Sequence, residues 1–142
     1  MKKGASSELY FQQKVDLKHK ILVVDDEAVA LLSCQKQLEA EGYAVNVAGN
    51  GPEALKQIKE NRFDLVVLDI KMPQMDGMDI LGKLTSIRPG MPVVLYTAYD
   101  YYRDNFMSWA ADAYIMKSPG DKELLAKIKE LLRGRFRKEM AA

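Results

Sequence analysis

The chain has 142 residues, of which 48% are hydrophobic and 29% charged, and its formal net charge is +1. This length suits one domain with a substantial core, and a single cysteine excludes an internal disulfide or a cysteine-based zinc site. No apolar run approaches the roughly 20 residues of a membrane span, and the start of the chain lacks the apolar segment of a secretory signal. We therefore expect a cytoplasmic protein without a membrane partner.

The charges are unevenly distributed along the chain. Residues 1–20 and 133–142 each carry a net charge of +3, whereas 21–132 carry −5. An acidic body with short basic ends argues against a nucleic-acid groove, so we expect no direct contact with nucleic acid. The string "ELYFQ" near the start resembles part of a purification-protease site, which makes this region either a native tail or the remnant of a tag.

Five apolar runs have the length of strands and begin 20 to 28 residues apart, at 21–24, 43–47, 65–68, 93–96 and 113–116. The stretches between and after them carry apolar residues at helical spacing. The expected helix faces are Ala28, Leu31, Leu32 and Leu38; Ala54, Leu55 and Ile58; Met78, Ile80, Leu81 and Leu84; Phe106, Trp109 and Ala110; and Leu124, Leu125, Ile128, Leu131 and Leu132. Five strand–helix units in a row predict a doubly wound α/β domain, with a parallel sheet covered by helices on both faces.

Turn-forming residues agree with these boundaries. Gly42 is expected to end the first helix, Gly51 and Pro52 to begin the second, and the segment 89–92 to form the turn into the fourth strand. The one cysteine, Cys34, falls within the first helix, where we expect a half-buried thiol with no chemical role.

Polar side chains follow four of the five predicted strands. Asp25 and Asp26 come after the first strand, Asp69 after the third, Thr97 after the fourth and Lys117 after the fifth. The carboxyl ends of parallel strands meet at one edge of a sheet, so these residues should become neighbours. Three carboxylates at one rim require positive charge, and their oxygen ligands best match Mg²⁺. A plainer alternative is that Asp26 or Glu27 caps the first helix.

Four motifs resemble the response-regulator receiver domain in order and spacing: "ILVVDDE", "DLVVLDIKMPQMDG", "VVLYTAYD" and "ADAYIMKSP". The resemblance covers 20–132, which divides the chain into an N-terminal extension at 1–19, a receiver domain at 20–132 and a basic C-terminal tail at 133–142. It implies a flavodoxin-like (βα)5 fold with strand order 2-1-3-4-5. It also implies a signalling protein rather than an enzyme, acting as a monomer or as a dimer promoted by phosphorylation.

The resemblance assigns a role to each acid. Asp69 would be the nucleophile that takes a phosphoryl group from a sensor histidine kinase or phosphotransfer protein. Asp26 would bind Mg²⁺ directly, Asp25 through water, and the backbone carbonyl of Lys71 would complete the protein ligands together with Asp69. The metal would then hold the carboxylate and the incoming phosphoryl oxygens together.

The remaining roles concern the phosphoryl group once it has arrived. Lys117 would pair with one phosphoryl oxygen and Thr97 would donate a hydrogen bond to another. The movement of Thr97 would let Tyr114 rotate inward from an exposed position, which makes both of them switch residues. The change would be transmitted to a downstream protein through the surface of the fourth helix, the fifth strand and the fifth helix of the receiver domain.

The residue after Lys117 departs from the family pattern. The family usually has proline there in a cis peptide, whereas this chain has Ser118 with Pro119 one place later. The Lys117–Ser118 bond is then either strained or trans. The sequence favours Ser118 as the N-cap of the last helix, with Pro119 at its first position and Asp121 completing an approximate capping box.

Other functions remain as alternatives. A Mg²⁺-dependent phosphatase of haloacid-dehalogenase type also uses an aspartate nucleophile on a parallel sheet, but it places an acid two residues later, where this chain has Lys71. The chain could also be a receiver cut from a longer regulator with an output domain, or a receiver fold that binds partners without being phosphorylated. The sequence has no glycine-rich phosphate-binding motif, which argues against a nucleotide hydrolase or a dinucleotide-dependent dehydrogenase.

Overall fold

The structure is a computed structural model that describes residues 18–70, 77–98 and 110–141. Its strands are β1 (Lys20–Val24), β2 (Ala44–Ala48), β3 (Leu65–Leu68), β4 (Val93–Thr97) and β5 (Ala113–Met116). Its helices are α2 (Ala28–Ala40), α3 (Gly51–Glu60), α4 (Gly77–Ile87) and α5 (Lys122–Ala141). The helix expected around Phe106 and Trp109 lies outside the described residues.

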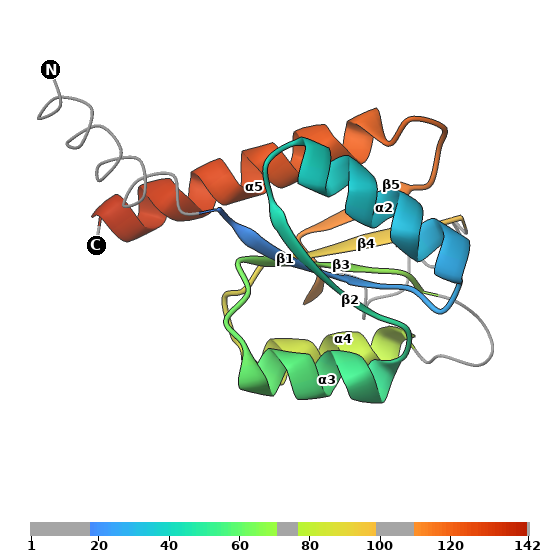
Figure 1. Ribbon diagram of the computed structural model, residues 1–142. Helices are drawn as coiled ribbons and strands as arrows, with labels where there is room; N and C mark the ends of the chain where they lie inside the picture. The colour runs from blue at the N-terminus through green and yellow to red at the C-terminus, as the bar shows by residue number, and fades with distance from the viewer. Residues whose placement is uncertain (1–17, 71–76, 99–109, 142) are drawn as a thin grey trace, which may run out of the picture.

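All five strands pair in parallel in the order β2-β1-β3-β4-β5. Helices α2 and α5 cover one face of the sheet, and α3 and α4 cover the other (Figure 1). The predicted fold class and strand order are therefore confirmed. Among the described residues, no helix is both long and apolar enough to cross a membrane.

Alternation along each strand divides the core between the two faces. The cluster on the α3/α4 side contains Leu22, Val24, Val66, Leu68, Val93 and Leu95, together with Ala54, Ile58, Leu81 and Leu84 from the helices. The cluster on the α2/α5 side contains Ile21, Val23, Leu65, Val67, Val94, Tyr96 and Ile115, together with Cys34, Leu38, Leu124, Ile128 and Leu132. Burial on both faces explains why the strand sequences are apolar throughout.

The buried face of α2 differs from the predicted one. Cys34 and Leu38 are buried and Leu31 is partly buried, whereas Ala28 is exposed and Leu32 is 53% exposed. Positions 31, 34 and 38 follow one stripe of a helix, and position 32 lies about 100° away from position 31. The expectation of a half-buried Cys34 was wrong, because its side chain is buried and belongs to the core cluster on the α2/α5 side.

The start of α5 also corrects a prediction. The helix begins at Lys122 rather than at Pro119, and the N–H of Asp121 donates to the Ser118 carbonyl at 3.3 Å, so these residues form a turn. Gly120 and Asp121 have positive φ values of 86° and 49°, which a helix cannot accommodate. Ser118 is therefore not the N-cap. At its other end α5 continues to Ala141, so most of the residues expected to form a tail are helical.

The first turn of α3 forms as its sequence predicts. Asn50 is the N-cap, and its side-chain oxygen accepts a hydrogen bond of 2.8 Å from the N–H of Glu53. Proline in the first turn has no N–H to satisfy, so Pro52 is well placed there. Gly51 begins the helix and is buried against α4.

We expect Gly51→Ala to destabilise the fold by about 1–3 kcal/mol, because an added Cβ would overlap the buried side chain of Ile80. Urea unfolding followed by circular dichroism measures the change. Gly82→Ala, within α4, is the matched control, because a Cβ there meets no atom within 4 Å. The control should leave stability unchanged or raise it by up to about 1 kcal/mol. Equal effects of the two changes would contradict the close contact between α3 and α4.

Candidate functional site

The predicted site residues lie at the carboxyl ends of the strands, and backbone hydrogen bonds to neighbouring strands fix three of them. The Asp25 N–H donates to the last carbonyl of β2 at 3.1 Å, and the Asp69 N–H donates to the last carbonyl of β1 at 3.0 Å. The Lys117 N–H donates to the last carbonyl of β4 at 2.8 Å. The sheet, rather than a loop, therefore sets the positions from which these side chains project.

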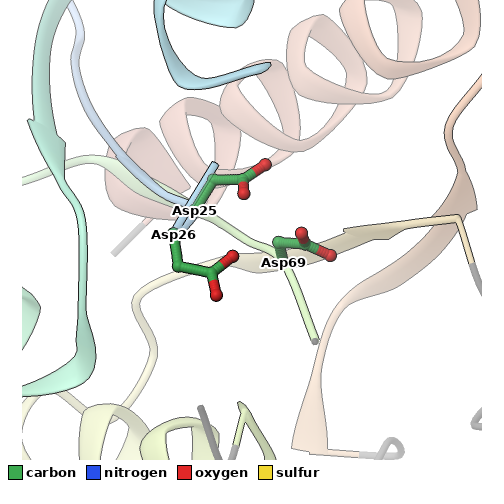
Figure 2. Close-up of side chains that lie close together, drawn as sticks. All are labelled: Asp25, Asp26 and Asp69. Atoms are coloured by element: carbon green, nitrogen blue, oxygen red, sulfur yellow. The ribbon is translucent and has the colours of Figure 1, made fainter. Parts of the chain in front are cut away.

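Three carboxylates gather at this edge. Figure 2 shows the side chains of Asp25, Asp26 and Asp69 close together at this edge. Each of the three places an oxygen within 4.8 Å of the others. Asp25 and Asp69 are only 4% and 5% exposed, whereas Asp26 is exposed. Two charges at this separation repel by roughly 3 kcal/mol at an effective dielectric constant of about 20. The cluster therefore requires nearby positive charge.

Lys117 supplies part of that charge. Its ammonium lies 2.8 Å from Oδ2 of Asp25 and 3.1 Å from Oδ2 of Asp69. Burial acts to lower the pKa of Lys117, but the hydrogen bond to Asp25 and the charges of both carboxylates outweigh it and raise the pKa. Lys117 is thus held as a cation between two acids.

Asp69 is the acid most affected by its surroundings. Burial raises the pKa of its carboxyl group, and the charge of Asp25 adds to this effect, although Lys117 acts in the opposite direction. One ammonium group thus compensates the local negative charge only in part. A second cation at the cluster would stabilise the ionised form of Asp69 further.

The alternative role as helix caps can be assessed at the start of α2. Glu27 occupies the N-cap position, but its side chain makes no capping hydrogen bond. Oδ1 of Asp25 instead accepts a hydrogen bond of 2.9 Å from the Glu27 N–H, while Oδ2 faces Lys117. The capping interpretation of Glu27 was therefore wrong, and the carboxylate of Asp26 belongs to the acid cluster.

Thr97 and Tyr114 occupy different surroundings. Thr97 is fully buried, and its hydroxyl donates to the backbone carbonyl of Ile70 at 3.1 Å. Tyr114 is partly buried and packs against the core cluster on the α3/α4 side, rather than starting from an exposed position. Lys71, expected to offer a carbonyl ligand, lies outside the described residues.

A cavity of about 380 Å³ extends from the acid cluster along α2. Its lining includes Asp25, Asp69 and Lys117 from the site, Cys34 from α2 and the turn 118–121. Burial raises the pKa of the Cys34 thiol from 9.0 to about 12, and the charge of Asp121 adds to this effect. The thiol is therefore fully protonated near neutral pH.

We expect Cys34 to be alkylated by iodoacetamide about a thousand-fold more slowly in the native chain than in guanidinium, because the reactive thiolate is so scarce. The native rate should rise as the pH approaches about 12, the pKa of the folded thiol. The folded thiol holds its proton more tightly than the unfolded one, so its contribution to stability falls as the pH rises above 9.0. Mass spectrometry of quenched samples gives both rates, and equal rates in the two states would contradict the burial.

One residue beside the site was not predicted from the sequence. The ring of the buried Tyr96 lies below Lys117, with its centre 5.8 Å from the Lys117 ammonium. Tyr96 stands within the quoted string "VVLYTAYD", one position before Thr97. The strand register pairs Tyr96 with Ile115, two residues before Lys117. The sequence does not display this register, so the contact could not be predicted from it.

Taken together, the fold and the site define an α/β protein in which acidic and basic side chains meet at the carboxyl edge of a parallel sheet. The family described as "Response regulator receiver domain" matches residues 21–129. The chain therefore belongs to the response regulator receiver domain family and is a receiver domain of the kind found in two-component systems. The recognition made from the four motifs is confirmed.

Individual proteins show the same likeness. The probable transcriptional regulatory protein TcrX of Mycobacterium tuberculosis is 39% identical over 115 residues, which are 80% of this chain and 49% of TcrX. The chain thus spans about half the length of the curated relatives it matches. The response regulator TrrA of Thermotoga maritima, crystallised with Mg²⁺ and BeF, is 42% identical with a TM-score of 0.76, covering 80% of this chain and 98% of that one. TrrA bound to the histidine kinase ThkA gives a TM-score of 0.75, with the same identity and coverage.

Proposed function

We propose that this receiver accepts a phosphoryl group on Asp69 from a sensor histidine kinase or a phosphotransfer protein. The observation that carries the proposal is the buried Asp69 carboxylate, with Lys117 at 3.1 Å and two further carboxylates within 4.8 Å. Such a site is short of positive charge and is built from groups that can hold a cation. The similar TrrA was solved with Mg²⁺ and BeF and also in complex with a histidine kinase, which supports both the metal and the kinase.

The donor set fits Mg²⁺. Asp25, Asp26 and Asp69 offer hard carboxylate oxygens from one edge of the sheet, and the exposed Asp26 leaves room for the water ligands that Mg²⁺ retains. The carbonyl of Lys71, outside the described residues, would be a further ligand. When bound, the ion neutralises charge on the acids and on the incoming phosphoryl oxygens.

The chain's own residues then perform the transfer. An ionised oxygen of Asp69 attacks phosphorus, the bond from phosphorus to the donor imidazole breaks, and its electron pair leaves with the imidazole. Lys117 is already within reach of Asp69 and pairs with a phosphoryl oxygen. No general base is required, because the attacking carboxylate carries no proton.

The signal would leave the site through Thr97 and Tyr114. The Thr97 hydroxyl exchanges the Ile70 carbonyl for a phosphoryl oxygen, which is a stronger acceptor because it is charged. Movement of Thr97 changes the packing around Tyr114 on the neighbouring strand. A downstream protein then reads the surface that includes β5, α5 and the helix predicted around 106–110.

Incubation with acetyl phosphate and Mg²⁺, followed by intact mass spectrometry, tests this function. One phosphoryl group should be added per chain, and chelation of Mg²⁺ with EDTA should prevent the addition. A chain that gains no mass under any donor and metal concentration would overturn the proposal. Continuous release of phosphate from many substrates would instead support a phosphatase.

A further inference from the structure

Tyr96 and Lys117 meet because of the register of the last two strands. Tyr96 of β4 pairs with Ile115 of β5, and both belong to the core cluster on the α2/α5 side. Side chains two residues apart on a strand share a face, so Lys117 projects to the same side as Ile115. The long lysine side chain then reaches over the tyrosine ring from the adjacent strand, and the ring centre is 5.8 Å from the ammonium.

This separation lies within the range of a cation–π interaction, in which the negative face of an aromatic ring attracts a cation. The interaction is strengthened when both partners are shielded from water. Tyr96 is 6% exposed, and both residues line the cavity that begins at the acid cluster. The ring therefore offers Lys117 a desolvated, uncharged partner on the floor of this cavity.

The other partners of Lys117 are the groups expected to bind the metal. Its ammonium bonds to Oδ2 of Asp25 at 2.8 Å and to Oδ2 of Asp69 at 3.1 Å. A divalent cation at the cluster competes for both oxygens and repels the ammonium. Mg²⁺ prefers oxygen ligands to an aromatic face, so the Tyr96 ring remains available to Lys117 when the carboxylates are occupied.

We propose that Tyr96 is a positioning residue that holds the Lys117 ammonium at the phosphorylation site when Mg²⁺ occupies the acid cluster. The inference rests on the proposed phosphoryl transfer to Asp69. Without the ring, the metal would drive the Lys117 side chain toward solvent. The side chain would then have to return before each phosphoryl transfer to Asp69. The ring thus raises the rate of phosphorylation, and the retained ammonium slightly weakens the binding of the metal.

Three changes at position 96 separate ring electrostatics from space filling. Tyr96→Phe keeps the aromatic face and removes the hydroxyl. Tyr96→Leu removes the face, and pentafluorophenylalanine at position 96 keeps the ring shape while reversing the charge of its face. Phosphorylation of the full chain by acetyl phosphate at saturating Mg²⁺ gives the maximal rate constant, and a Mg²⁺ titration gives the metal affinity.

We expect Tyr96→Phe to stay within about twofold of the unchanged chain, and both Tyr96→Leu and the fluorinated ring to lower the maximal rate constant about fivefold. Metal affinity should be unchanged in Tyr96→Phe and should rise slightly in the other two, because the ammonium is then free to move away from the metal. Equal rates for the fluorinated ring and for Tyr96→Phe would overturn the inference, because the ring would then only fill space. This comparison stands even if Tyr96→Leu fails to fold.

A nuclear magnetic resonance measurement separates failure of this inference from failure of the proposed function. Protons lying over an aromatic face are shifted upfield, so the ε-methylene signal of Lys117 should be upfield with and without Mg²⁺, and should lose that shift in Tyr96→Leu. An unchanged chain that shows the shift but takes up no phosphoryl group refutes the function alone. A chain that is phosphorylated but loses the shift when Mg²⁺ is added refutes the positioning role alone.

Discussion

With Asp69→Asn, the chain is expected to take up no phosphoryl group from acetyl phosphate under conditions in which the unchanged chain takes up one. An amide has no ionised oxygen to form the bond to phosphorus, and the two remaining acids of the cluster follow β1 rather than β3. The fold should persist, because the amide has nearly the same shape and relieves repulsion with Asp25 and Asp26. Intact mass spectrometry measures the adduct.

Asp79→Asn is the matched control for this substitution. Asp79 is an exposed aspartate in the first turn of α4 that pairs with Lys83 at 3.0 Å and does not belong to the acid cluster. The control should gain one phosphoryl group at the normal rate. Retention of the adduct in Asp69→Asn would show that another residue is the acceptor, and peptide mapping would then identify it.

Lys117→Met should produce two opposite effects. Phosphorylation should slow by about 10²–10³-fold, the usual result of removing a group that stabilises developing negative charge at a buried site. Mg²⁺ should bind about tenfold more tightly, because the ammonium no longer occupies Asp25 and Asp69 or repels the metal. Methionine keeps most of the length and apolar character of the lysine side chain, so the space that this side chain occupies remains filled.

Rates with acetyl phosphate and a Mg²⁺ titration measure the two effects of Lys117→Met separately. Lys83→Met, in the exposed ion pair on α4, should change neither. Slower phosphorylation together with weaker metal binding would contradict the proposed competition between Lys117 and Mg²⁺ for Asp25 and Asp69. It would mean that Lys117 acts on the site only by stabilising the fold.

The sequence predicts the sheet and the acid cluster well because both depend on local order. An apolar run followed by a polar residue marks a strand and its carboxyl end, and parallel pairing then brings Asp25, Asp26 and Asp69 together. The burial of α2 was predicted poorly, because Leu32 is apolar and yet exposed, while the less conspicuous Cys34 faces the core. Periodicity alone does not choose between overlapping stripes on one helix.

Other features depend on contacts that the sequence does not display. Ser118 and Pro119 have the composition of a helix start, but the left-handed backbone of Gly120 and Asp121 delays α5 until Lys122. The contact of Tyr96 with Lys117 depends on the pairing of two strands. The proposed ligand Lys71 lies outside the described residues, and its role is still a prediction.

The two halves of the site differ in how firmly the sheet holds them. The acids follow β1 and β3, each flanked by strands on both sides, whereas Lys117 follows β5, which is an edge strand of the described sheet. Separating the acids would require the pairing of β1 with β3 in the middle of the sheet to break. Lys117 would be displaced as soon as the edge strand β5 separates from β4. If both proposed activities hold, a partly opened molecule would still bind a cation after it had lost the ability to accept a phosphoryl group.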